Sequence, residues 1–159
     1  MNVRFPKNIL NRCNYMNFNI NEGLMRRTAG EAFVLPDYQR GDVWSQAQKI
    51  KFLESLLIKI PVGSYCVHLD EDTGQWELLD GQQRWTAIFN YVDNQFPVFG
   101  LYYRDLTDVE LRYFKFLEFP VFMASGFSEE EKLELFNRLA YGGTPNSVND
   151  EKTKRTRLM

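Results

Sequence analysis

The segment Asp80–Arg84, which reads Asp-Gly-Gln-Gln-Arg, brings together residue types that suit the binding of a phosphate group. The apolar pair Leu78-Leu79 before it is typical of the end of a buried strand. After it, apolar residues recur at the spacing of a helix, namely at Trp85, Ile88, Phe89 and Val92. We therefore expect the chain to turn at Gly81 from a strand directly into a helix that begins at or near Gln82.

A turn of this kind can hold an anion, because the first amides of a helix have no partner within the helix and carry the positive end of its dipole. Gly81 lets a ligand approach the backbone closely, and Arg84 can contact phosphate oxygens with its forked guanidinium. Gln82 or Gln83 can hold a water molecule or a ribose hydroxyl, and Asp80 can hold a divalent cation. The alternative for the same residues is an ordinary capped helix with solvated polar side chains.

Two further segments carry candidate residues on predicted turns. Gln39 and Arg40 lie in a turn-forming segment, where an exposed surface loop is the simpler interpretation. Gly142 and Gly143 follow the last predicted helix, where they can serve as its C-terminal cap. Taken alone, neither segment indicates a binding site.

The scarce residue types limit the chemistry. The 159-residue chain has one histidine, His68, and two cysteines, Cys13 and Cys66, which leaves too few ligands for a His/Cys zinc site. His68 lies in an alternating segment typical of a strand, and we expect a buried histidine with satisfied hydrogen bonds rather than a catalytic one. The net charge of −2 predicts no general basic surface, so any contact with nucleic acid must be local.

Hydrophobic spacing and capping boxes predict helices over residues 21–28, 45–60, 82–92, 108–116 and 128–141. β-Rich segments predict strands over residues 31–35, 62–69, 75–79, 96–103 and 119–123. This mixture predicts a single α/β (α+β) domain over residues 31–145, with an N-terminal arm over 1–30 and a polar, basic tail over 146–159. No apolar stretch approaches the roughly 18 residues that span a membrane, and the chain does not begin like a signal peptide, so we expect a cytoplasmic protein.

Together these segments resemble the DUF262 family, which forms the N-terminal part of GmrSD-type restriction enzymes within the ParB/sulfiredoxin-like superfamily. The resemblance covers residues 33–145. Leu35–Gly41 with Trp44 resembles the opening block of the family, Asp80–Arg84 is its DGQQR motif, and Leu135–Pro145 resembles its third block. The resemblance implies a ParB/sulfiredoxin-like domain with a small mixed sheet flanked by helices.

The resemblance also implies a nucleotide-binding function. Members use the DGQQR turn to hold an NTP, and often to hydrolyse it, with a divalent cation such as Mg²⁺. Carried over to this chain, the catalytic candidates are Asp80, Gln82, Gln83 and Arg84, with Asp80 as the metal ligand. The nucleotide-binding candidates are Gln39, Arg40, Gly81, Arg84, Gly142 and Gly143. The implied setting is a bacterial cell or a phage-infected host, in DNA restriction or phage–host conflict, with DNA or a protein as a further partner.

Two departures from the family pattern leave alternatives open. The third block usually reads Phe-x-x-x-Asn-x-x-Gly, and here Ala140 stands at the Asn position, so we expect weak hydrolysis or none. The C-terminal nuclease domain of the restriction members is also not part of this chain, so we do not expect a complete two-domain enzyme. The alternatives to an NTPase are a non-catalytic regulatory or protein- or DNA-binding module, which Ala140 favours, and a metal-dependent DNA nicking enzyme, which the near-neutral charge supports little.

Overall fold

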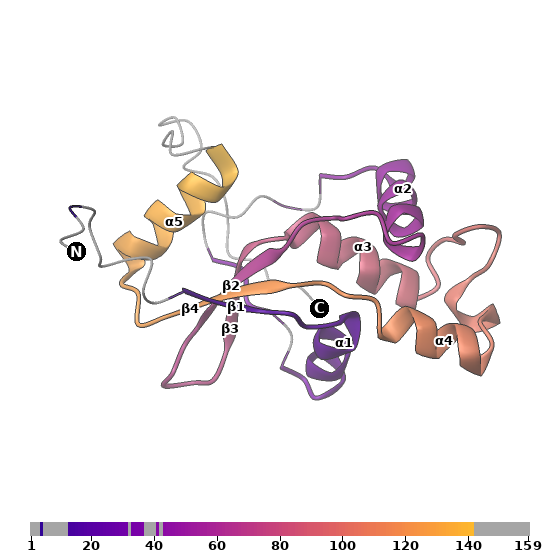
Figure 1. The fold of residues 1–159 in the computed structure, drawn as a ribbon, viewed down its shortest axis with the longest axis horizontal. Coiled ribbons are helices and arrows are strands. Elements are labelled where there is room, and N and C mark those ends of the chain that lie inside the picture. The colour runs from indigo at the N-terminus through magenta and orange to yellow at the C-terminus, as the bar shows by residue number, and fades with distance from the viewer. Residues whose placement is uncertain (1–3, 5–12, 32, 37–40, 42, 142–159) are drawn as a thin grey trace.

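The computed structural model describes residue 4 and residues 13–31, 33–36, 41 and 43–141 (Figure 1). This part of the chain contains a four-stranded sheet in the order β1-β4-β2-β3. Its strands are β1 (Cys13–Met16), β2 (Tyr65–Leu69), β3 (Trp76–Asp80) and β4 (Val121–Ser125). The pairs β1–β4 and β2–β3 are antiparallel and β2–β4 is parallel, so the predicted α/β fold with a small mixed sheet is confirmed.

Helices surround this sheet. They are α1 (Ile20–Thr28), α2 (Gln46–Leu57), α3 (Gln82–Val92), α4 (Asp108–Lys115) and α5 (Glu129–Tyr141), with a short 3-10 helix, η2 (Tyr103–Asp105). The predicted capping boxes are confirmed at the start of α2, where Ser45 and Gln48 bond each other, and at the start of α5, where Ser128 and Glu131 do the same. In Figure 1, α5 lies at the opposite end of the molecule from α4.

Aromatic residues make up much of the core beneath one face of the sheet. Trp85 of α3 is fully buried, and its ring centroid lies 5.1 to 5.2 Å from those of Phe33, Tyr65 and Phe119. Gly23 of α1 lies directly against the Trp85 indole, so a Cβ at this position would collide with the ring. The helices α1 and α3 therefore meet around one tryptophan side chain.

On the opposite face of the sheet, α5 packs against the edge strand β3. Side chains alternate between the two faces of a strand. On β3, Trp76 and Leu78 belong to the aromatic core, whereas Glu77 between them contacts Lys132 of α5. Neighbouring side chains of β3 thus contact the aromatic core on one face of the sheet and α5 on the other.

The structure differs from the sequence prediction in three segments. The strand predicted over residues 96–103 is wrong: Val98 and Leu101 form an isolated bridge around a tight turn at Phe99 and Gly100, both with positive φ, and η2 follows. The strand predicted over 31–35 is reduced to a parallel bridge between Val34 and Glu77. The strand β1 was not predicted, because its residues, Cys13 to Met16, show no clear alternation of apolar and polar side chains.

Candidate functional site

The chain passes from β3 to α3 through one residue, Gly81. Its φ of 110° lies in the left-handed region, which residues with a Cβ rarely adopt. A Cβ at this position would also lie only 2.7 Å from the Cβ of Tyr65 on β2. Glycine alone fits this turn without strain, and the predicted order of strand, glycine and helix is confirmed.

Arg84 lies in the first turn of α3, and its guanidinium is held in place on two sides. Nη1 donates a hydrogen bond to the carbonyl of Val62 at 3.0 Å, and Nη2 donates to Oδ2 of Asp80 at 3.3 Å. The guanidinium carbon also lies 5.3 Å from the ring centroid of Phe119. Burial lowers the pKa of Arg84, but an arginine stays charged at neutral pH because its ordinary pKa is so high. The start of α3 therefore carries a fixed positive charge.

Asp80, at the end of β3, contacts the Arg84 guanidinium, but this contact does not fully stabilise its ionised carboxylate. Burial raises the pKa of its carboxyl group, and the Arg84 guanidinium and the backbone amide of Gly81 offset that increase only in part. The side chain remains 41% exposed. A partly exposed carboxylate whose negative charge is only partly compensated can bind a cation from solution.

The two glutamines between them have different environments. Gln82 is buried. The amide oxygen of Gln83 accepts hydrogen bonds from the backbone N–H groups of Val43 and Trp44, both at 3.1 Å, and its Nε2 donates to the carbonyl of Gly41 at 2.8 Å. Gln83 thus ties the segment before α2 to the first turn of α3. Sequence reasoning missed this function, because its partners lie about forty positions earlier in the chain and follow no local pattern.

A shallow hollow of about 470 Å³ lies beside the Arg84 guanidinium, between α2 and residues 60–62. Its described lining residues are Trp44, Gln48, Lys51, Phe52, Ser55, Ile60, Pro61, Val62 and Arg84. A larger hollow of about 610 Å³ is also lined by residues 60–62, and its charged lining residues are one cation, Lys59, and one carboxylate, Glu118. Arg84 lines only the smaller of these two, whose two cations suit an anionic ligand better.

Residues 20–156 match the family described as the N-terminal domain of the GmrSD restriction endonuclease. The chain belongs to this family. No match is found among curated proteins. The predicted membership of the DUF262 family is therefore confirmed, and it links the chain to DNA restriction.

Only some of the site residues expected of a GmrSD N-terminal domain can be placed. Asp80, Gly81 and Arg84 come together at the start of α3, with Gln82 and Gln83 in the same turn. Gln39, Arg40, Gly142 and Gly143 lie outside the described residues. Ala140 lies in the last turn of α5, and its side chain is also outside the description.

A second charged cluster in this GmrSD N-terminal domain lies at the contact between β3 and α5. Nζ of Lys132 lies 2.9 and 3.0 Å from the two carboxylate oxygens of Glu77 and 2.6 Å from Oε1 of Glu129. His68 accepts a hydrogen bond at Nε2 from the backbone N–H of Phe127, which leaves Nδ1 to donate to Glu77 at 3.2 Å. The expected buried histidine with satisfied hydrogen bonds is confirmed, and this cluster fixes α5 to the sheet.

The described residues contain neither a cluster of metal ligands nor a membrane-spanning helix. Among residues 13–31, 33–36 and 43–141, no three His, Cys, Asp or Glu side chains are grouped as a metal site would require. In the same part, no helix is long and apolar enough to cross a membrane. Cys13 and Cys66 are not joined in a disulfide bond, and burial raises the pKa of Cys66 to about 12, so it is unreactive as a nucleophile.

Proposed function

We propose that the Asp80–Arg84 turn binds the phosphates of an NTP together with a divalent cation. The observation that carries this proposal is the Arg84 guanidinium, which is fixed beside a hollow at the start of a helix. A guanidinium has five N–H groups, and the hydrogen bonds to Asp80 and Val62 leave others for a ligand. A fixed cation and the positive end of a helix dipole both favour phosphate oxygens.

Asp80 is the residue that would hold Mg²⁺ at this turn. Mg²⁺ in nucleotide sites is usually bound by one or two carboxylates, waters and the phosphates of the substrate, so a single partly exposed carboxylate suits a cation that arrives with the NTP. When bound, the cation neutralises charge on the phosphates. Because the cation needs the ionised carboxylate, and burial raises the pKa of Asp80, we expect its binding to weaken as the pH falls through that raised value.

We infer that NTP binding is the principal function and that hydrolysis is slow. The amide oxygen of Gln83 already accepts two backbone hydrogen bonds, so holding an attacking water would require the segment before α2 to move. Ala140 at the usual Asn position favours the same conclusion. The domain would then act as the nucleotide-dependent regulatory part of a restriction system, with DNA or a partner protein as its target.

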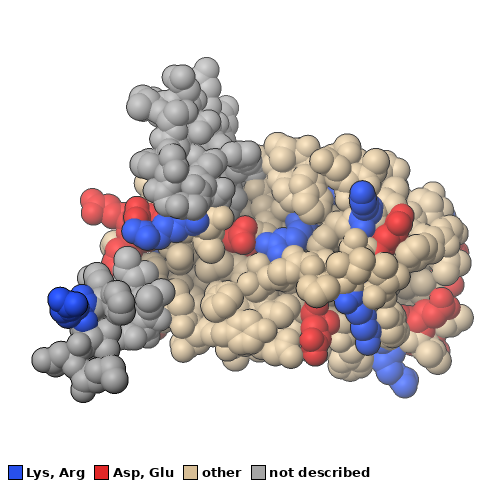
Figure 2. Space-filling view, turned by 45° about the horizontal axis from the view of Figure 1, so that its top comes forward, with Lys and Arg blue, Asp and Glu red and all other residues tan. Residues whose placement is uncertain are grey.

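The surface charge supports a small ligand over a long DNA-binding groove. Figure 2 shows Lys and Arg interspersed with Asp and Glu on the visible face, with no continuous basic stripe among the residues drawn in colour. Binding to duplex DNA draws on many cations that neutralise successive phosphates. A pocket for one NTP needs only a few cations in fixed positions.

The test is a thermal shift experiment with Mg²⁺ and each of the four common NTPs. A ligand at about 100 times its Kd stabilises the folded state by about 2.7 kcal/mol, which raises the Tm of a domain of this size by about 5–10 °C. We expect the substitution Arg84→Gln to weaken NTP binding at least tenfold. The matched control is Arg112→Gln, which removes an exposed arginine from α4 and leaves binding unchanged.

Phosphate release separates the binding function from catalysis. We expect the unmodified chain to release phosphate from bound NTP at a rate near the background rate, and Ala140→Asn to increase that rate. Rapid phosphate release without any substitution would overturn the binding-only conclusion. If no NTP shifts the Tm of the folded protein, the proposal as a whole is wrong. Nicking of plasmid DNA that depends on Arg84 would favour the nuclease alternative.

A further inference from the structure

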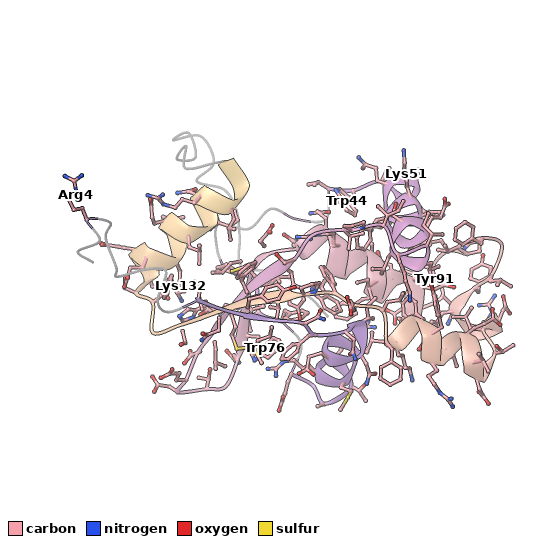
Figure 3. All side chains as sticks on the ribbon, viewed as in Figure 1. Arg4, Trp44, Lys51, Trp76, Tyr91 and Lys132 are labelled. Carbon is pink, nitrogen blue, oxygen red and sulfur yellow. The ribbon has the colours of Figure 1, made fainter. Side chains whose placement is uncertain are left out.

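The hollow beside Arg84 has features that the binding of phosphate alone does not explain. Its volume of about 470 Å³ is that of a small-molecule site. Its lining residues include Trp44, Lys51 and Gln48, whose side chains carry an indole, a primary ammonium and a carboxamide. Figure 3 shows Trp44 on the segment before α2 and Lys51 on α2, on the same side of the molecule.

The backbone of Trp44 is held by a residue of the candidate phosphate site. Its backbone N–H donates to the amide oxygen of Gln83 in the first turn of α3. Its ring is braced by Phe52, with centroids 5.6 Å apart and planes inclined at 59°, and the side chain is partly exposed where it lines the hollow. A rigid aromatic surface at a fixed distance from a phosphate site is suited to stacking a planar ring.

The polar groups of the hollow are mainly donors. The amide oxygen of Gln48 is used to accept a bond from the backbone N–H of Ser45, which leaves its Nε2 for other partners. Lys51 is exposed and forms no ion pair with any described residue. No acidic residue is among the described lining residues. Donors beside an aromatic ring complement the ring nitrogens and carbonyl oxygens of a nucleobase.

From these contacts we propose that the hollow is the base-binding subsite of the nucleotide whose phosphates bind at Asp80–Arg84, with the base stacked on Trp44. Lys51 and Gln48 donate to the edge of the base. The inference rests on the proposed function, because Arg84 is shared between the two parts of the site. Trp44 and Lys51 are therefore assigned as binding residues, and neither takes part in a chemical step.

The experiment compares nucleotides with a ligand that has phosphates and no base. Affinities of ATP, GTP, CTP, UTP and inorganic tripolyphosphate, each with Mg²⁺, are measured by calorimetry. We expect at least one nucleotide to bind about tenfold more tightly than tripolyphosphate, as loss of one stacked base predicts. Trp44→Leu should remove this difference and leave tripolyphosphate binding within about twofold, whereas Trp44→Phe should keep most of it. Lys51→Met should reduce the affinity of the nucleotide more than that of tripolyphosphate.

Tryptophan fluorescence gives a readout that needs no variant. The other two tryptophans, Trp76 and Trp85, are 6% and 0% exposed, so quenching by a stacked base reports mainly on Trp44. We expect quenching by a nucleotide and none by tripolyphosphate. Equal affinities for tripolyphosphate and all four nucleotides, without quenching, would overturn the base subsite and leave the phosphate site intact. If neither kind of ligand binds, the proposed function itself is wrong.

Discussion

Glu77 and Asp80 lie three positions apart on β3, but folding shifts the pKa values of their carboxyl groups in opposite directions. Hydrogen bonds from His68 and Lys132 lower the pKa of Glu77 and outweigh the effect of its burial. Burial raises the pKa of Asp80, and Arg84 does not compensate fully. The ionised form is therefore favoured by folding at Glu77 and disfavoured at Asp80.

This difference in pKa indicates that the Glu77 carboxylate has a structural role, whereas the Asp80 carboxylate is available to a ligand. Lys132, which is 5% exposed, contacts both carboxylate oxygens of Glu77, and His68 adds a third hydrogen bond. Asp80 has one guanidinium contact at 3.3 Å and an exposed fraction of 41%. A carboxylate whose oxygens already accept enough hydrogen bonds is stabilised little by an added cation. A carboxylate with unsatisfied oxygens is stabilised more by the same cation.

The largest effect on stability is expected from removing the contact between Glu77 and Lys132. Lys132→Met removes the ammonium and leaves the Glu77 carboxylate buried without two of its three side-chain hydrogen bonds, which should lower the free energy of unfolding by about 3 kcal/mol. Urea denaturation measures this loss. The control is Glu129→Gln, whose carboxylate is 76% exposed and should contribute less than about 1 kcal/mol. A loss below 1 kcal/mol for Lys132→Met would mean that this cluster does not fix α5.

A smaller effect is expected from distorting the other end of β3. Gly81→Ala places a Cβ 2.7 Å from the Cβ of Tyr65 at a φ of 110°, and should lower the free energy of unfolding by about 2 kcal/mol. Gly100→Ala is the matched control, because Gly100 also has a positive φ, of 76°, but has no atom within 4 Å of the added Cβ. Equal losses in the two variants, measured by urea denaturation, would show that contact with β2 does not restrict this turn.

The smallest effect, and the most direct test of the comparison, is the pH dependence of stability. The lowered pKa of Glu77 gives a stabilising contribution that is complete above its ordinary value of 4.5 and is lost as the pH falls through the folded value. The raised pKa of Asp80 gives the opposite sign: its penalty grows as the pH rises from 3.8 through the raised value.

Asp80→Asn should therefore leave the protein as stable or slightly more stable at pH 7, by less than about 1 kcal/mol, whereas Glu77→Gln should destabilise it. Unfolding free energies measured from pH 3 to 7 for both variants and the unmodified chain provide the comparison. Stability differences that change with pH in the same direction for both variants would contradict the opposite environments of the two carboxyl groups.

The sequence predicts best those features whose partners are close in the chain. The capping boxes at Ser45 and Ser128 span three residues, and the strand, glycine and helix around Gly81 are continuous, so local patterns are enough to locate them. The failure at residues 96–103 has a local cause as well. Phe99 and Gly100 adopt positive φ, and apolar composition alone does not reveal that.

The features that sequence reasoning missed depend on contacts between distant segments. The pair Glu77–Lys132 spans 55 positions. The sequence around Lys132 is typical of a solvated helix surface, and only the packing of α5 against β3 reveals its contact with Glu77. The hydrogen bonds of Gln83 to the segment before α2 are equally non-local. The candidate phosphate site was predictable as a turn, but the hollow beside it requires the tertiary structure.

The order of strands also has a consequence for the way this chain is made. The first and second strands do not touch each other, because β4 lies between them and pairs with both. Cys13 is opposite Ala124 in that pairing, so the ribosome must add 111 residues (124 − 13) after Cys13 before its partner exists. At about 5–20 residues per second, about 6–22 s pass between the synthesis of Cys13 and that of Ala124, and β1 has no partner strand during this time. During synthesis β4 is thus the strand that completes the sheet, and a chain that stops before Val121 retains only the β2–β3 hairpin.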